Sequence, residues 1–131
     1  MSYKFVCRNL FTKSPLILFF RNNTLLGHST YSIVDSNVGC INNIYIEPEF
    51  RKQQYGSKLL KYTEDLLKYS YYKNNCDILV HSEPHDHLLD FFRSNNYNEK
   101  PVIHRSVSSS NYNVYDDGTT IFTLIPMRKN L

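Results

Sequence analysis

The stretch that decides the fold of this chain is residues 44–60, which read IYIEPEFRKQQYGSKLL. An apolar segment opens it, a basic turn with a glycine follows, and apolar positions at helical spacing close it. Backbone N–H groups at the N-terminus of a helix attract anions, and a glycine there lets a phosphate come close to the main chain. The stretch therefore predicts a strand, a phosphate-binding turn and an amphipathic helix in succession.

The size and charge of the chain limit what can surround this segment. The chain has 131 residues, of which 41% are hydrophobic and 15% aromatic. This is enough for one domain with a packed core and too little for two, so a single domain over residues 1–131 is expected. The net charge of +3 is small and the basic residues are scattered, which does not indicate a nucleic-acid surface. The charge favours anionic ligands only mildly.

Cysteine usage and hydropathy indicate the compartment. Cys7, Cys40 and Cys76 are an odd number and have no Cys-x-x-Cys spacing, which argues against a disulfide framework and a structural zinc site. The longest apolar run, residues 16–20, is far shorter than the roughly 20 residues of a membrane-spanning helix, and the N-terminus lacks a signal-peptide pattern. We expect a soluble cytoplasmic protein with no membrane contact.

The N-terminal third predicts an antiparallel meander. Strands are expected at residues 3–8, 16–21, 24–34 and 38–46, with turns at residues 22–23 and 35–37. Ile41 and Ile44 are three residues apart, so both face one side of their strand only if the strand contains a bulge. We therefore expect a bulge near Asn42 and Asn43.

A helix is expected from Ser57 to about Tyr71, because apolar residues recur there at helical spacing. Two i,i+4 pairs, Lys61 with Asp65 and Glu64 with Lys68, are expected on its solvent side. The apolar run at residues 76–81 then predicts a strand buried on both faces.

The C-terminal part predicts a shorter helix and more strands. The helix starts after the Ser-Glu-Pro signal at residues 82–84 and stops near residues 95–96. A strand at residues 102–107, a polar loop at residues 108–118 and a final strand at residues 119–125, ended by Pro126, complete the chain.

Three segments together resemble a known family. The turn at residues 51–56, RKQQYG, matches the pyrophosphate-binding pattern Gln/Arg-x-x-Gly-x-Gly/Ala of the GNAT superfamily of acyl-CoA-dependent N-acyltransferases. Residues 89–97, LDFFRSNNY, resemble that family's second helix, and residues 123–129 are similar to its last strand. The resemblance is best over residues 38–97, while the segment before Leu16 is shorter than the family's usual first two helices.

The resemblance implies an α/β fold with a mixed, mainly antiparallel sheet, splayed at the end of the strand at residues 38–46 and flanked by helices. It implies an N-acetyltransferase that moves an acetyl group from acetyl-CoA to a primary amine by direct attack. The pantetheine arm of the cofactor would pair with that strand, and its pyrophosphate would lie on the turn, next to the cations Arg51, Lys52 and Lys58. The implied cofactor-binding residues are Ile44, Tyr45, Ile46, Arg51, Lys52, Gln53, Gln54, Tyr55, Gly56, Ser57 and Phe92.

Two positions depart from the family pattern. Gln54 stands where the family has its first glycine, so its side chain either blocks the close approach of a phosphate or forces a non-glycine residue into an unfavourable backbone region. A left-handed residue costs about 1–2 kcal/mol, which weakens cofactor binding without abolishing it. Phe92 stands where many members have a tyrosine that protonates the departing thiolate. Loss of a general acid costs on the order of 10² to 10⁴ in rate, whereas positioning two substrates is worth effective molarities of about 10⁵ M or more. Acyl transfer therefore survives at a lower rate.

The proton acceptor has three candidates. The family often places a Glu or His on the bulged strand, where this chain has Cys40 and Asn42. Asn42 can hold a water that takes the proton from the amine. The alternative to a chemical role for Cys40 is that it packs as a small buried apolar residue. His81, at the carboxyl end of a buried strand, is the preferred acceptor.

Several alternatives remain open. A catalytically degenerate member would bind CoA or a protein partner without catalysis, and a small structural domain would carry the motifs by coincidence. His85 and His87 face apart on a helix, so no metal site is predicted, and His85 remains a minor cofactor contact. The amine acceptor is unspecified: a small amine, an amino sugar or a protein amine. The final strand suggests a homodimer.

Overall fold

The computed structural model describes residues 2–8, 15–35, 38–69, 76–82, 86–99, 113–116, 120–123 and 125–131. The chain falls into two compact units, one made of Met1–Ile78 with Asn130–Leu131 and the other of Leu79–Lys129. The single-domain organisation expected from the sequence stays a prediction.

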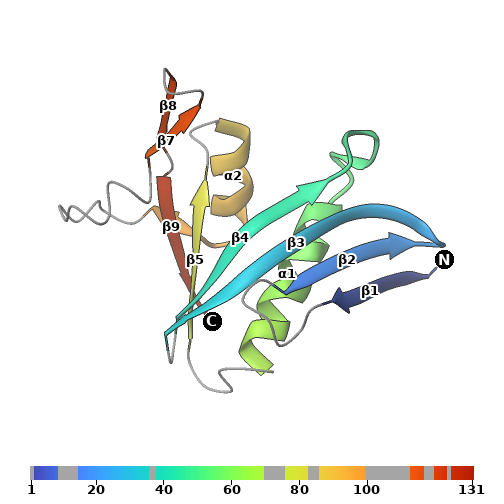
Figure 1. Cartoon of the computed structure of the whole chain (residues 1–131). Helices are drawn as coiled ribbons and strands as arrows, with labels where there is room; N and C mark the ends of the chain where they lie inside the picture. Colours follow the sequence, from blue (N-terminus) through green and yellow to red (C-terminus); the bar gives the residue numbers. More distant parts are fainter. Residues whose placement is uncertain are drawn as a thin grey trace. The chain divides into compact units, whose positions relative to one another are not determined.

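The first unit begins with an antiparallel meander of four strands (Figure 1). The strands are β1 (Tyr3–Arg8), β2 (Leu16–Arg21), β3 (Thr24–Asp35) and β4 (Val38–Ile46). Asn22 and Asn23 connect β2 to β3 with φ angles of 51° and 73°, the pair of positive values that a tight type I′ hairpin turn requires. The predicted meander is confirmed, with strand ends within one residue of the expected ones.

The predicted bulge in β4 is also confirmed. The pairing between β3 and β4 moves from Thr30 opposite Asn43 to Tyr31 opposite Ile41, so Asn42 is the extra residue. Because of this extra residue, Ile41 and Ile44 lie on the same face of the strand.

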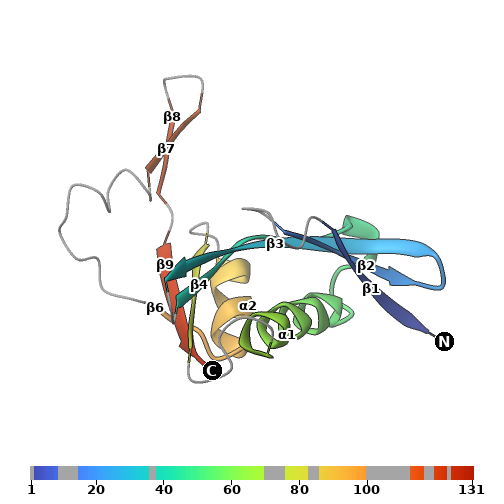
Figure 2. The same ribbon diagram turned by 60° about the horizontal axis from the view of Figure 1, so that its bottom comes forward.

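The helix α1 (Tyr55–Leu67) covers one face of the meander and contacts β3 and β4 (Figure 2). Leu59, Leu60 and Leu67 are buried on its inner face, and the Lys61–Asp65 pair, with an N–O distance of 3.0 Å, lies on the outer side as predicted. The solvent-side placement of Glu64 was wrong, because Glu64 is only 2% exposed. It lies one helical turn from Leu60 and from Leu67, within the buried stripe.

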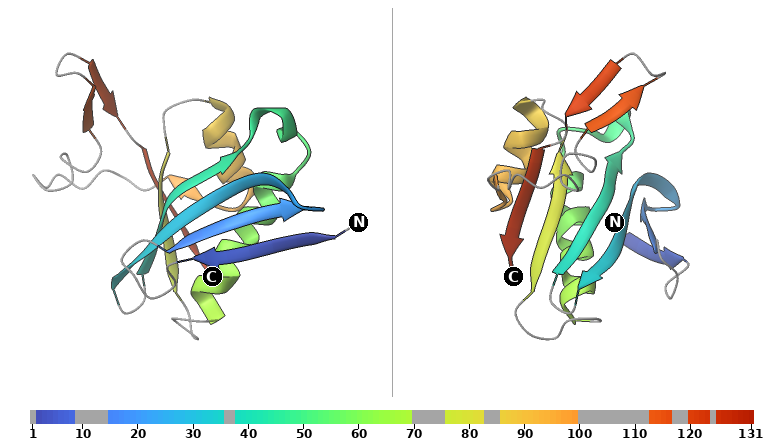
Figure 3. Two further views of the ribbon diagram at one scale, coloured as in Figure 1. Left: turned by 45° about the vertical axis from the view of Figure 1, so that its right-hand side comes forward. Right: turned by 60° about the vertical axis from the view of Figure 1, so that its left-hand side comes forward.

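The second unit contains most of β5 (Asp77–Ser82), α2 (Asp86–Ser94), β6 (Asn98–Glu99) and β9 (Ile125–Asn130). The strand β9 lies between β5 and β6, and Figure 3 shows it beside β5. Leu89, Phe92, Tyr97 and Met127 are buried in this unit. The strand at residues 76–81 and the short helix were therefore predicted correctly, with small shifts at their ends.

Two expectations for the C-terminal part are wrong. The segment β7 (Asn113–Asp116) pairs with β8 (Thr120–Thr123) in a two-stranded sheet, although a polar loop was expected through residue 118. The polar composition of this segment did not indicate the hairpin, because two strands pair through their backbone groups rather than through their side chains.

The single final strand expected at residues 119–125 is also wrong: residues 120–123 form β8, and a separate strand of another sheet, β9, runs from Ile125 through Pro126 to Asn130. Its pairs with β6 are made by Met127 and Arg128, so they do not need the N–H that proline lacks. The strand expected at residues 102–107 lies outside the described residues. Among the described residues, no helix is both long enough and apolar enough to cross a bilayer.

Candidate acyl-CoA site

The chain leaves β4 through a compact turn and enters α1. A short 3₁₀ helix, η1 (Pro48–Phe50), follows Glu47, whose N–H donates to the Leu26 carbonyl at 2.8 Å. The N–H groups of Phe50 and Arg51 donate to the carbonyls of Glu47 and Pro48 at 2.9 and 3.3 Å. These hydrogen bonds hold the turn against the end of the meander.

Gln54 adopts the left-handed conformation that the family pattern assigns to a glycine. Its φ and ψ angles are 67° and 12°, and it is the N-cap of α1. Lys52 has a φ of 64°, so two non-glycine residues of this turn have positive φ. Gln54 makes no side-chain capping hydrogen bond, so its side chain does not satisfy the N–H groups of the first helical turn. An anion complements such N–H groups.

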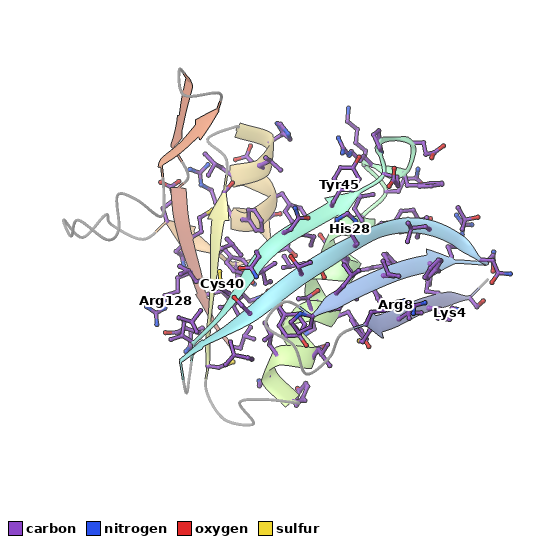
Figure 4. All side chains as sticks on the ribbon, viewed as in Figure 1. Lys4, Arg8, His28, Cys40, Tyr45 and Arg128 are labelled. Carbon is purple, nitrogen blue, oxygen red and sulfur yellow. The ribbon has the colours of Figure 1, made fainter. Side chains whose placement is uncertain are left out.

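Arg51 is directed toward the end of β4. Its Nε donates to the Ile46 carbonyl at 2.8 Å, and its guanidinium lies 5.2 Å from the centre of the Tyr45 ring. The His28 ring lies 5.4 Å from that of Tyr45, and Figure 4 shows the two side chains on neighbouring strands. Arg51 therefore positions the turn against β4 as well as adding positive charge.

The other residues of the turn differ in how far their side chains are exposed. Tyr55 is 5% exposed, and its hydroxyl accepts a hydrogen bond of 2.9 Å from Arg21 Nη1, so its side chain belongs to the core. Lys58 points to β1, with its ammonium 5.4 Å from the centre of the Tyr3 ring. Lys52 and Gln53 are exposed. Tyr55 thus has only its backbone to offer a ligand.

The two candidates on β4 have different surroundings. Asn42 is exposed at the bulge, and its Oδ1 accepts a hydrogen bond of 3.3 Å from Ser32 Oγ. Cys40 is 6% exposed, and burial raises the pKa of its thiol to about 11. Cys40 is therefore a neutral thiol near pH 7, which disfavours it as a base.

The comparisons with known proteins identify the family. The family model described as Acetyltransferase (GNAT) family matches residues 3–97, more than half of the chain. The chain belongs to the GNAT acetyltransferase family. No curated protein matches the sequence.

Solved structures share the GNAT fold. A GNAT family acetyltransferase from Elizabethkingia anophelis with acetyl-CoA bound has a TM-score of 0.71 and 21% identity, over 92% of this chain and 78% of that one. A Bacillus subtilis acetyltransferase in complex with CoA has a TM-score of 0.70 and 13% identity, with coverages of 91% and 78%. For the Escherichia coli ribosomal-protein-S18-alanine N-acetyltransferase, the TM-score is 0.67, the identity 18% and the coverages 90% and 69%. The expected mixed, mainly antiparallel α/β fold is confirmed.

The two remaining GNAT candidates belong to the second unit. Phe92 is 6% exposed, and its ring packs edge-on against Phe91 and Tyr97, with centroid distances of 5.2 and 5.6 Å. These contacts give Phe92 a packing role within the second unit. The backbone of His81 lies in β5, but its side chain is outside the described part of the structure. The cofactor contact of Phe92 and the catalytic role of His81 stay predictions.

Gly27 is a residue beside the candidate site that sequence reasoning missed. It lies opposite Ile46, and a Cβ built on it would lie 2.1 Å from the Tyr45 carbonyl oxygen and 2.8 Å from Ile46 Cδ1. The close approach of β3 to the end of β4 therefore requires a glycine. A glycine inside a strand pattern was the available signal.

Proposed function

We propose that this protein is an N-acetyltransferase that moves an acetyl group from acetyl-CoA to a primary amine. The observation that carries the proposal is Gln54, which adopts a glycine-like conformation at the N-terminus of α1 in the motif position. Membership of the GNAT family supports it, and so does the likeness in fold to proteins crystallised with acetyl-CoA or CoA.

The cofactor would be held by backbone groups. Its pyrophosphate would lie on the N–H groups of residues 51–57, where oriented amides and the helix dipole favour an anion. Its pantetheine arm would pair with β4 at Ile44, Tyr45 and Ile46, and the amides of this strand would stabilise the oxyanion of the tetrahedral intermediate. The Ile46 carbonyl already accepts a hydrogen bond from Arg51, so the pairing of the pantetheine arm with β4 would end at Ile46.

In the proposed reaction, the neutral amine attacks the thioester carbonyl carbon, the C–S bond breaks, and CoA leaves as a thiolate. His81, or a water held by Asn42, would accept the proton that the amine loses. Cys40 would have only a packing role, since its raised pKa leaves almost no thiolate near pH 7. Phe92 has no proton to donate, and a thiolate is a tolerable leaving group without one.

The acceptor, the compartment and the assembly are also proposals. A small amine, an amino sugar and a protein amine all fit a primary-amine acceptor. The free thiols of Cys7, Cys40 and Cys76 suit a reducing, cytoplasmic compartment. A homodimer through the final strand would use a face of β9, because β5 and β6 lie along its two edges.

Two measurements test the proposed function. Acetyl-CoA is titrated by calorimetry, and CoA release is then followed with a thiol reagent against a panel of small amines, amino sugars and peptides. Micromolar binding together with amine-dependent release is expected. Binding without release from any amine would favour the degenerate CoA-binding alternative, which the Phe92 position motivates. Absence of binding would overturn both.

A matched pair of variants tests whether acetyl-CoA binds at the turn. Gly56→Asp places a carboxylate where the pyrophosphate is expected, so it should weaken acetyl-CoA binding by at least tenfold. Lys68→Ala changes a charge beyond the other end of α1 and should leave binding unchanged. Equal effects of the two variants would contradict the placement of the pyrophosphate.

A further inference from the structure

A groove of about 480 Å³ lies between β1 and α1 within the first unit. Its floor is aromatic, with the Phe5 ring stacked between those of Tyr62 and Phe19 at centroid distances of 4.0 and 4.5 Å. Tyr3, which is 39% exposed, continues this floor, and Lys58 and Lys61 stand on its α1 side. The groove therefore offers exposed aromatic surface beside positive charge.

The groove follows a sheet edge. Within the described part of the chain, β1 has a neighbouring strand, β2, on one side only, and Figure 3 shows it as the outermost strand of the meander. The Asn22 N–H donates to the Ser2 carbonyl at 3.1 Å, so the backbone groups of Ser2 point toward β2. Backbone direction alternates along a strand, so the N–H and C=O groups of Phe5 and Cys7 point the other way, to the outer edge.

The side chains of the same two residues point toward α1, and that of Phe5 lines the groove. Phe5 stacks on Tyr62, and Cys7 Sγ lies 3.7 Å from the Tyr62 hydroxyl oxygen. A strand added to the outer edge of β1 would therefore place every second side chain over the aromatic floor. An extended peptide can hydrogen-bond to the backbone edge of β1 and fill the groove at the same time, whereas a small aromatic molecule can only fill the groove.

The charges around β1 select the kind of peptide. Lys4 and Arg8 lie on the face of β1 away from the groove (Figure 4), and the Lys4 ammonium is 5.5 Å from the centre of the Phe20 ring. The only carboxylate among the described groove residues is that of Asp65, which is paired with Lys61. A second copy of β1 would bring Lys4 and Arg8 against like charges, which is unfavourable across strands. An acidic strand meets opposite charges.

We propose that β1 and this groove bind an extended acidic segment of another protein, which adds a strand to the outer edge of β1. Its alternate apolar side chains cover the aromatic floor, and its acidic side chains meet Lys4 and Arg8 on the opposite face. Main-chain hydrogen bonds supply affinity in this mode of recognition, and the alternating pockets and charges supply specificity. The groove is also lined by Gln54, Ser57 and Lys58, so it borders the turn proposed to hold the pyrophosphate, whereas the pantetheine arm is proposed to lie on β4.

The probe is a synthetic peptide of alternating Glu and Val or Phe, titrated into the 131-residue chain by calorimetry. We expect micromolar binding, weakened by salt, with shifts of the β1 amides in NMR spectra. A peptide with Lys in place of Glu should bind at least tenfold more weakly. Equal binding of the two peptides, or none, would overturn the proposal; the lysines would then serve only to block edge pairing.

Backbone pairing is tested on the peptide itself. N-methylation of one alternate set of residues should abolish binding, whereas methylation of the other set should be tolerated, since only one set pairs with β1. Equal tolerance of both sets would exclude strand addition. A concentration-dependent dimer that competes with the peptide would instead assign the edge to a second copy of this chain.

A charge reversal tests the basic face of β1. Lys4→Glu should weaken the acidic peptide by about three- to tenfold, the size expected for exposed charge pairs, and should strengthen the lysine peptide. Lys4 is exposed, so the variant should fold. Lys68→Glu makes the same charge change outside β1 and the groove, and should bind both peptides as the unmodified protein does. Equal behaviour of the two variants would remove the charges of β1 from the interaction.

Discussion

Gln54 illustrates how a single residue can keep a motif's geometry without its glycine. At its φ of 67°, a non-glycine residue costs about 1–2 kcal/mol, and glycine's greater freedom in the unfolded chain offsets roughly 0.5–1 kcal/mol of that. Gln54→Gly should therefore raise the free energy of unfolding by about 0.5–1 kcal/mol. Loss of the side chain should also tighten CoA binding several-fold, because phosphate can come closer to the backbone.

Urea denaturation and calorimetric titration with CoA check the two parts of this prediction. Gln53→Gly is the matched control, since Gln53 is not among the residues with positive φ. It should lower stability slightly and leave affinity unchanged. If Gln53→Gly tightened CoA binding as much as Gln54→Gly, the pyrophosphate would not lie at the start of α1.

The buried Cys40 thiol predicts a loss of stability at alkaline pH. Its pKa is about 11 in the folded protein against 9.0 for an ordinary cysteine, so the folded state holds this proton more tightly than the unfolded state does. The free energy of unfolding should thus be unaffected below about pH 9 and fall between about pH 9 and 11, by up to about 2 kcal/mol. The measured quantity is the difference between the unmodified protein and Cys40→Ala across that range. A constant difference would mean that the Cys40 thiol is not shielded from water.

Some residue-level features were readable from the sequence and others were not. The bulge at Asn42 was predictable, because Ile41 and Ile44 can share a face in no other way. The hydrogen bond from Arg51 to the Ile46 carbonyl depends on the path of the turn, and the contact that Gly27 makes with β4 depends on which strands lie side by side. Local spacing carries no such information.

At the scale of elements, periodicity and turn chemistry were sufficient for the meander and for the existence of α1, which runs from Tyr55 to Leu67 rather than from Ser57 to about Tyr71. They failed where burial or pairing depends on distant residues. Glu64 satisfied an i,i+4 charge pattern and is nevertheless buried, and Pro126 was taken as a strand end although β9 continues through it. The relation of His81 and Phe92 to the turn involves both units, and spacing along the sequence does not fix it.

The packing of β3 on β4 depends on Gly27. In Gly27→Ala, the new methyl group would lie 2.1 Å from a backbone oxygen of β4, so one strand must shift. We expect a loss of about 1–3 kcal/mol in the free energy of unfolding, as for overpacked sites, together with weaker CoA binding because Tyr45 and Ile46 move. Val34→Ala, on the same strand at a position 58% exposed, is the control and should change neither quantity appreciably. Unchanged stability in Gly27→Ala would show that β3 and β4 adjust without cost.

At the scale of the whole molecule, the first unit contains residues from both ends of the chain, Met1–Ile78 and Asn130–Leu131. The Leu131 N–H donates to the Cys76 carbonyl at 2.8 Å, and Asn130 Nδ2 donates to Asp77 Oδ1 at 2.7 Å. The last described residues therefore pair with the start of β5, in the unit that carries the candidate turn. A single cooperative unfolding transition, seen alike by amides of both units in hydrogen exchange, is the observation that would support the predicted single domain.

Cofactor binding should stabilise the folded chain by mass action. CoA at about 100 times its dissociation constant should add roughly 2.7 kcal/mol to the free energy of unfolding, if only the folded state binds it. Hydrogen exchange should slow most at β4 and at the start of α1, because the cofactor is proposed to contact the backbone there. Pantetheine at the same concentration lacks the pyrophosphate and should give a much smaller shift. Equal shifts would show that the turn contributes nothing to binding, and no shift with CoA would leave only a structural role for the fold.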